Sequence, residues 1–166
     1  MTQKINSSLL IVDDEELILE VLSASLGQEG LRIDQANNGK NALEMIKQNT
    51  YHAILSDIHM PQKTGLELLK EIRDLGIITP FIVLTGFGDQ QKAVEALKLG
   101  AFDFIDKPWD EPYLQDVVGR ALELGTHLER FAQSPDDIAS LLEVHFENNR
   151  SSLAYLAKHL NLQGKS

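Results

Sequence analysis

Residues 9–16 read LLIVDDEE, and this stretch decides the fold. The run Leu9–Val12 is aliphatic without polar alternation, which is typical of a strand buried on both faces. Such strands occur in parallel sheets that helices cover on both sides. Four acidic residues follow where the strand ends, so the same stretch predicts a cluster of carboxylates at one edge of the sheet.

The rest of the sequence continues this pattern to about residue 125, because short aliphatic segments alternate with segments of helical periodicity. Five strands are predicted, at Leu9–Val12, Leu31–Ala36, Ala53–Ser56, Phe81–Leu84 and Phe102–Ile105. Five helices are predicted, at Glu15–Gln28, Lys40–Gln48, Gly65–Leu75, Gln90–Leu99 and Glu111–Leu124. The alternation predicts an α/β domain over residues 1–125, with a five-stranded, doubly wound parallel sheet.

Composition restricts the class of protein. The chain has 166 residues, 43% of them hydrophobic, no cysteine and a formal net charge of −10. The absence of cysteine excludes disulfides and thiolate metal sites. An acidic chain is unsuited to nucleic acid or anionic membranes, so neither is expected as a partner. No apolar run reaches the roughly 18 residues of a membrane helix, and the polar N-terminus lacks the pattern of a signal peptide, so a cytoplasmic location is expected.

Polar groups follow four of the five predicted strands. Asp13 and Asp14 follow the first, Asp57 the third, Thr85 the fourth and Lys107 the fifth. In open α/β sheets the functional groups lie beyond the carboxyl ends of the strands, so we expect these side chains to meet. Each of them alone has an ordinary explanation as a turn or cap residue, and it is their convergence that predicts a site.

The chemistry of this set is that of phosphoryl transfer. Clustered carboxylates repel one another unless a cation lies among them, and Mg²⁺ prefers such oxygen ligands. A carboxylate can attack phosphorus to form an aspartyl phosphate. The ammonium of Lys107 and the hydroxyl of Thr85 could then neutralise charge on the phosphoryl oxygens.

Four stretches resemble the receiver domain of bacterial response regulators, over roughly residues 7–125. They are LLIVDDEE, AILSDIHMPQKTGLELL, PFIVLTGFGD and GAFDFIDKPW. The resemblance implies a flavodoxin-like receiver fold and a two-component phosphorelay, in which a histidine kinase or phosphotransfer protein donates a phosphoryl group to Asp57. The protein would then be a switch rather than an enzyme, with a downstream protein or a second copy of itself as partner.

The resemblance also implies a role for each site residue. Asp57 becomes the 4-aspartylphosphate, Thr85 is the switch hydroxyl, Phe104 is the aromatic that turns inward, and Lys107 binds the phosphate and precedes a cis-proline. Positions such as those of His59 and Phe87 tune how fast the phosphoryl group is lost. The expected Mg²⁺ ligands are Asp13, Asp14, Asp57 and the backbone carbonyl of His59.

Two other functions fit part of this pattern. A Mg²⁺-dependent phosphatase would also pass through an aspartyl phosphate, but such enzymes usually carry a second Asp two residues after the nucleophile, where this chain has His59. They also usually place the nucleophile on the first strand. A pseudo-receiver that signals without phosphate is the other alternative, and the complete set of site residues speaks against it.

Residues 126–166 form a predicted helical extension. The fifth helix is expected to pass the usual domain end, because Leu122, Leu128 and Phe131 continue its apolar stripe. Ser134 then caps a predicted helix from about Pro135 to Asn148, and a last short helix is predicted after Ser151 or Ser152, around Leu153, Leu156, Ala157 and Leu160. These pieces are too small to fold alone, so we expect a docking or dimerisation element.

An alternative for the extension is the beginning of an output domain. The segment RSSLAYLAKHLNL, at residues 150–162, looks like the first helix of a helix-turn-helix. The sequence ends at Ser166, before a recognition helix could form, and its charge does not favour DNA. The chain could therefore also be a piece of a larger regulator with a helix-turn-helix output domain.

Overall fold

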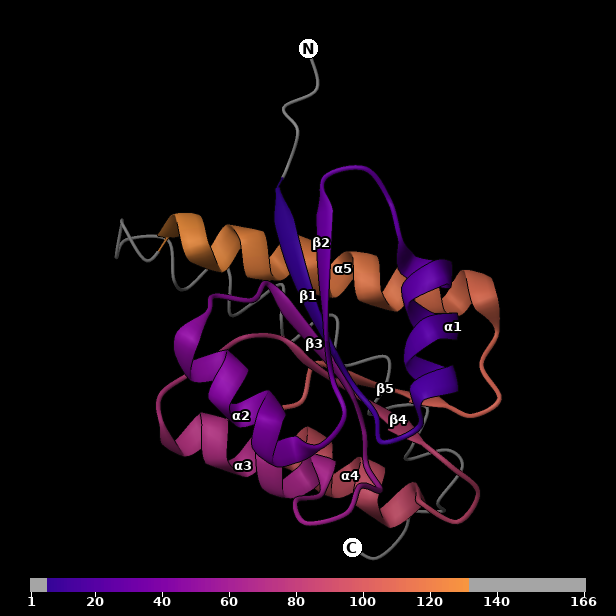
Figure 1. Ribbon diagram of the computed structural model, residues 1–166. Helices are drawn as coiled ribbons and strands as arrows, with labels where there is room; N and C mark the ends of the chain where they lie inside the picture. Colours follow the sequence, from indigo (N-terminus) through magenta and orange to yellow (C-terminus); the bar gives the residue numbers. More distant parts are fainter. Residues whose placement is uncertain (1–5, 132–166) are drawn as a thin grey trace, which may run out of the picture.

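The computed structural model describes residues 6–131, which fold into one sheet between two layers of helices (Figure 1). The strands are β1 Ser7–Val12, β2 Leu31–Ala36, β3 Ala53–Asp57, β4 Phe81–Thr85 and β5 Asp103–Asp106. The helices are α1 Glu16–Leu26, α2 Gly39–Gln48, α3 Gly65–Asp74, α4 Gln90–Lys98 and α5 Glu111–Phe131. All strand pairs are parallel and the strand order is β2-β1-β3-β4-β5, so the predicted α/β fold is confirmed.

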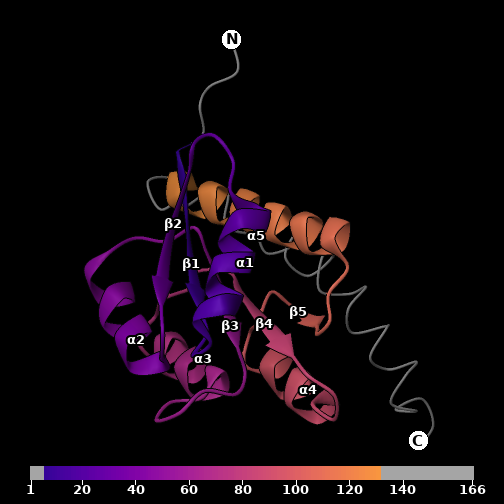
Figure 2. The same ribbon diagram turned by 45° about the vertical axis from the view of Figure 1, so that its right-hand side comes forward.

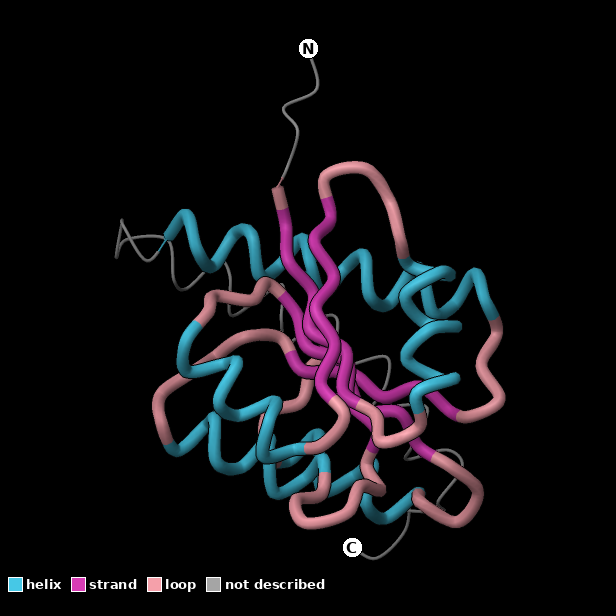
Figure 3. Tube along the Cα trace, viewed as in Figure 1, coloured by secondary structure: helices cyan, strands magenta, loops and turns pink. Residues whose placement is uncertain are grey.

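The helices α1 and α5 cover one face of the sheet, and α2, α3 and α4 cover the other (Figure 2). The strands form the layer between them (Figure 3). Successive side chains of a strand point to opposite faces, so an uninterrupted aliphatic strand supplies both cores. In β1, Leu9 and Ile11 pack with α1 and α5, whereas Leu10 and Val12 pack with α2 and α3.

The element bounds differ from the predicted ones by at most two residues, except at the end of α5. The strands β3 and β4 include Asp57 and Thr85, which were predicted to follow them. Helix α1 ends at Leu26 because the backbone of Gly27 is extended. Helix α3 begins after Thr64, whose side chain accepts the N–H of Glu67 at 3.2 Å, as an N-cap does.

Helix α5 continues without a break from Glu111 to Phe131. The expected extension beyond the usual domain end is therefore confirmed as far as Phe131, and the buried side chain of Leu122 and the partly buried Leu128 lie on its packed face. The predicted boundary at residue 125 falls inside this helix and stays a prediction. The helices predicted from Pro135 onward lie outside the described residues. Among residues 6–131, no helix is long and apolar enough to cross a membrane.

Candidate functional site

The carboxyl edge of the sheet brings the predicted site residues together. Asp57 is the last residue of β3, and the register pairs Val12 of β1 with Ser56, so Asp13 lies beside Asp57. Thr85 is the last residue of β4, and Lys107 follows β5. The strand order alone therefore makes one site from residues that lie far apart in the sequence.

Three carboxylates form the centre of the site. Asp13, Asp14 and Asp57 each place an oxygen atom within 4.8 Å of the others, with Asp13 and Asp57 buried and Asp14 exposed. Burial raises the pKa of Asp13 to about 6, and repulsion from Asp57 adds to this, although the N–H of Glu15 donates to Oδ1 of Asp13 at 2.9 Å. Such crowded, partly desolvated oxygen donors fit a hard divalent cation, which would relieve their repulsion.

Lys107 supplies a cation to this cluster. Its Nζ lies 2.9 Å from Oδ2 of Asp57 and 3.5 Å from Oδ2 of Asp13. Burial alone would lower the pKa of Lys107, but the hydrogen bond and charge of Asp57, together with Asp13, raise the pKa above its usual value. The ammonium group therefore stays charged next to the predicted phosphoacceptor. The Lys107–Pro108 peptide bond is cis, as predicted.

The sequence matches the family model of the response regulator receiver domain over residues 9–119. The chain belongs to this family. Receiver domains of response regulators are signalling switches of two-component systems, so the predicted class of protein is confirmed.

Curated relatives agree with the receiver assignment. The transcriptional regulatory protein FixJ of Rhizobium meliloti (strain 1021) is 34% identical over 144 residues, which are 87% of this chain and 71% of FixJ. The regulatory protein AtoC of Escherichia coli (strain K12) is 40% identical over 116 residues, which are 70% of this chain and 25% of AtoC. The chain thus spans about a quarter of the length of AtoC.

Solved receiver structures show the same fold. The crystal structure of FixJ-N has a TM-score of 0.66 at 35% identity, and the match covers 74% of this chain and 96% of the FixJ-N chain. The receiver domain of the Francisella response regulator 1452 has a TM-score of 0.67 at 31% identity, with coverage of 71% and 98%.

The two residues predicted to form the switch, Thr85 and Phe104, have contacts that the sequence did not predict. Thr85 donates its hydroxyl proton to Oδ1 of Asp106 at 2.7 Å. Phe104 is already buried, at 6% exposure, in the same apolar cluster as Val83 and Ala101. Burying an aromatic ring is favourable by about 1.5–3 kcal/mol, and this cluster offers the ring an apolar site. Phe104 is thus already buried in this structure, and the switch roles of Phe104 and Thr85 stay predictions.

His59 connects the receiver site to the β4–α4 loop. Its backbone N–H donates to Oδ1 of Asp57 at 3.3 Å, while its exposed side chain contacts Oδ1 of Asp89 through Nε2 at 2.7 Å. The other carboxylate oxygen of Asp89 accepts the N–H of Gly86 at 2.8 Å. Burial on its own raises the pKa of Asp89, but His59 and Gly86 outweigh it and lower the pKa below its usual range.

Sequence reasoning missed Asp89 and Asp106 as parts of the site. Asp106 is the last residue of β5 and Asp89 lies in the loop after β4, and both segments were predicted to end at the carboxyl edge. The hydrogen bonds of Asp106 with Thr85 and of Asp89 with Gly86 could not be predicted, because they depend on side-chain rotamers that no sequence pattern specifies.

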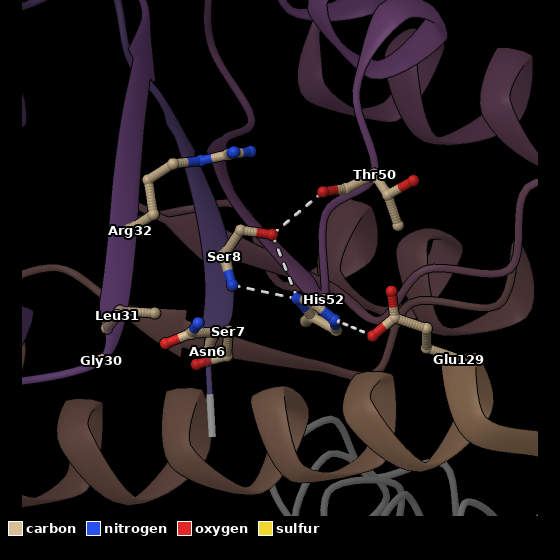
Figure 4. A pocket seen from close by; sticks show the side chains of 9 residues that line it. All are labelled: Asn6, Ser7, Ser8, Gly30, Leu31, Arg32, Thr50, His52 and Glu129. Atoms are coloured by element: carbon tan, nitrogen blue, oxygen red, sulfur yellow. Dashed lines mark hydrogen bonds and ion pairs between the residues drawn. The ribbon is translucent and has the colours of Figure 1, made fainter. Parts of the chain in front are cut away.

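A second polar cluster lies at the opposite edge of the sheet (Figure 4). The ring of His52 accepts the N–H of Ser8 at Nδ1 (2.9 Å), and its Nε2 lies 2.6 Å from Oε2 of Glu129. The hydroxyl of Ser8, 3.1 Å from Nδ1, donates instead to the carbonyl oxygen of Thr50 at 2.9 Å. This arrangement superficially resembles a Ser-His-acid triad. However, the Nδ1 lone pair already accepts the Ser8 N–H, so His52 cannot act as a base for Ser8. The cluster instead fastens the end of α5 to β1 and to the residue before β3.

Proposed function

We propose that Asp57 accepts a phosphoryl group from a histidine kinase or phosphotransfer protein, and that this modification switches the binding of a partner. A carboxylate oxygen of Asp57 attacks phosphorus, the P–N bond to the donor imidazole breaks, and the imidazole leaves with the electron pair and takes up a proton. The observation that carries the proposal is the contact of Lys107 with both Asp57 and Asp13, next to an oxygen donor set suited to a divalent cation.

The residues of the site divide the work. Asp57 is the nucleophile, held at the end of a buried strand. Lys107 pairs with its carboxylate and can follow the charge onto the phosphoryl group, as charge-assisted donors do. Thr85 offers a hydroxyl from the neighbouring strand.

Asp13, Asp14 and Asp57, with the backbone carbonyl of His59, are the residues that would hold Mg²⁺. A bound Mg²⁺ would supply positive charge that neutralises the carboxylates and the phosphoryl oxygens. The fit rests on the donors, which are hard oxygen atoms with one exposed member, Asp14, facing solvent.

Mass spectrometry after incubation with acetyl phosphate and Mg²⁺ tests the proposal. We expect one phosphoryl adduct on Asp57, lost in Asp57→Asn and without Mg²⁺. Asp110→Asn removes a carboxylate from the loop after Lys107 and should leave labelling unchanged. A full-stoichiometry adduct in Asp57→Asn protein would refute the assignment.

One observation supports a second proposal, for the extension. The family model ends at residue 119, but the similarity to the transcriptional regulator FixJ covers 144 residues of the chain and therefore reaches past the receiver. This favours an output element in residues 126–166 over a passive appendage, and leaves the expectation of no nucleic-acid contact a prediction. Fluorescence anisotropy of labelled duplex DNA, titrated with the protein at low salt with and without beryllofluoride, tests whether the extension contacts DNA. A DNA-bound fraction that appears only with beryllofluoride would overturn the expectation of no nucleic-acid contact.

A further inference from the structure

The end of β4 offers two hydrogen-bond donors beside Asp57, and a carboxylate occupies each of them. Leu84 pairs with Asp57 in the sheet, so Thr85 and Gly86 are the next residues along the neighbouring strand. The hydroxyl of Thr85 donates to Asp106 at 2.7 Å, with the carbonyl of Ile105 at 3.4 Å as a longer contact. The N–H of Gly86 donates to Asp89 at 2.8 Å.

The fold positions both acceptors. Thr85 and Asp106 are register partners in adjacent parallel strands, so their side chains point to the same face. Asp89 immediately precedes α4 and is buried, and its second oxygen is braced by the ring of His59 at 2.7 Å. His59 in turn lies two residues after Asp57, in the loop that follows the phosphoacceptor.

A hydroxyl has one proton and an amide has one, so neither donor can serve a carboxylate and a phosphoryl oxygen fully at once. We infer that Asp106 and Asp89, the latter braced by His59, are positioning residues that hold the Thr85 hydroxyl and the Gly86 amide in the unphosphorylated arrangement. The inference rests on the proposed phosphorylation of Asp57 and adds what that phosphoryl group has to displace.

The consequence is that the two carboxylates stabilise the unphosphorylated arrangement and so oppose the conformational switch. Hydrogen bonds to a charged acceptor are stronger than neutral ones, so the phosphoryl group gains only the difference between its own bonds and those of the carboxylates. Removing either carboxylate favours the arrangement in which the donors face Asp57. A ligand that requires this arrangement binds with higher apparent affinity when less free energy is needed to reach it.

Binding of beryllofluoride, a phosphoryl mimic, at saturating Mg²⁺ tests the inference. We expect Asp106→Ala and Asp89→Ala to bind it about tenfold more tightly than the wild type, the effect of losing one charge-assisted bond. Asp106→Asn keeps an uncharged acceptor and should lie between. Glu95→Gln, which removes one exposed charge from α4, is the matched control and should match the wild type.

A second measurement is independent of the ligand and the metal. In the metal-free protein, amide hydrogen exchange at Gly86 should be faster in Asp89→Ala. If Asp89→Ala fails to fold, His59→Ala should show the same change more weakly, because it removes only the brace. Faster exchange together with tighter binding is a result that a purely structural role does not produce, since mere loosening would weaken binding.

The possible failures are distinguishable. If the wild type and Glu95→Gln bind no beryllofluoride, the proposed function fails, and this inference with it. If they bind it but the folded Asp106 and Asp89 variants bind it no more tightly, the inference alone is overturned and Asp57 remains the proposed phosphoacceptor.

Discussion

The ammonium nitrogen of Lys107 lies 2.9 Å from Oδ2 of Asp57, although 50 positions separate the two residues in the sequence. The contact crosses the carboxyl edge of the sheet from the end of β5 to the end of β3, over the strand β4 that lies between them. It keeps a positive charge next to the carboxylate of Asp57, the proposed phosphoacceptor. In the proposed function Lys107 neutralises the phosphoryl group while the carboxylates hold Mg²⁺, and variants can test these two roles one at a time.

Lys107→Ala should slow labelling of Asp57 by acetyl phosphate without abolishing Mg²⁺ binding. The variant loses a charge-assisted contact of about 1.5–3 kcal/mol, which corresponds to a rate about tenfold to a hundredfold lower. Lys107→Arg keeps the charge on a differently shaped group and should fall between. Labelling rates by mass spectrometry and Mg²⁺ affinity by calorimetry give the two readouts. Loss of Mg²⁺ affinity in Lys107→Ala would contradict this division.

Asp14→Ala should weaken Mg²⁺ binding by about tenfold or more, because it removes an exposed, charged member of the proposed ligand set. The tryptophan Trp109, the only one in the chain, lies close in sequence to Lys107 and provides a fluorescence signal for titration. Glu16→Gln is the matched control, since it removes an exposed carboxylate at the start of α1. Unchanged Mg²⁺ affinity in Asp14→Ala would show that Asp14 is not a ligand.

The raised pKa of Asp13 predicts how the stability of the metal-free protein depends on pH. The pKa is raised from 3.8 to about 6 in the folded state, so the folded protein holds this proton to a higher pH than the unfolded chain does. Ionised Asp13 therefore destabilises the fold. The free energy of unfolding should fall by up to about 3 kcal/mol from this group as pH rises from about 4 to 6.

Asp13→Asn isolates this contribution, because its neutral amide can still accept the Glu15 N–H. In EDTA the variant should be more stable than the wild type at pH 7.5, and the difference should shrink as the pH falls toward 4. Urea unfolding at several pH values measures it. Parallel stability curves for the two proteins would show that burial does not perturb Asp13.

The positions of Asp13, Asp57, Thr85 and Lys107 could be predicted because they follow from topology. Aliphatic strands that alternate with helices give a parallel sheet, and parallel strands bring their carboxyl ends to one edge. No side-chain detail was needed for this, and an error of one residue in a strand boundary, as at Asp57, did not move the residue away from the site.

The links of Thr85 to Asp106 and of His59 to Asp89 could not be predicted, because each depends on rotamers and loop geometry rather than on periodicity. The contact of His52 with Glu129 could not be predicted for another reason. It spans 77 positions and requires the last turns of α5 to lie over the amino edge of the sheet, which the helical periodicity of α5 does not specify.

Activation should reach the extension through α5. If phosphorylation redocks residues 126–166 or changes a dimer built through them, hydrogen exchange in that segment should differ between the free and the beryllofluoride-bound protein. The same comparison should show a change near Thr85. A change near Thr85 with none beyond residue 125 would mark the extension as passive.

Two glycines of α5 provide a matched test of how tightly its end is fastened. A Cβ at Gly125 would lie 1.8 Å from the carbonyl oxygen of His52, a backbone atom, whereas a Cβ at Gly119 would have no neighbour within 4 Å among the described residues. In a helix, Ala is intrinsically better than Gly by about 0.8–1 kcal/mol. Gly119→Ala should therefore stabilise the protein by about that amount.

Gly125→Ala should destabilise the protein by about 1–3 kcal/mol, because the helix end has to move off the sheet. It should also separate the side chains of His52 and Glu129, seen as a change in the NMR chemical shift of the His52 ring nitrogen Nε2. Urea unfolding of both variants gives the two signs, and a stabilised Gly125→Ala protein would show that α5 is not seated on His52.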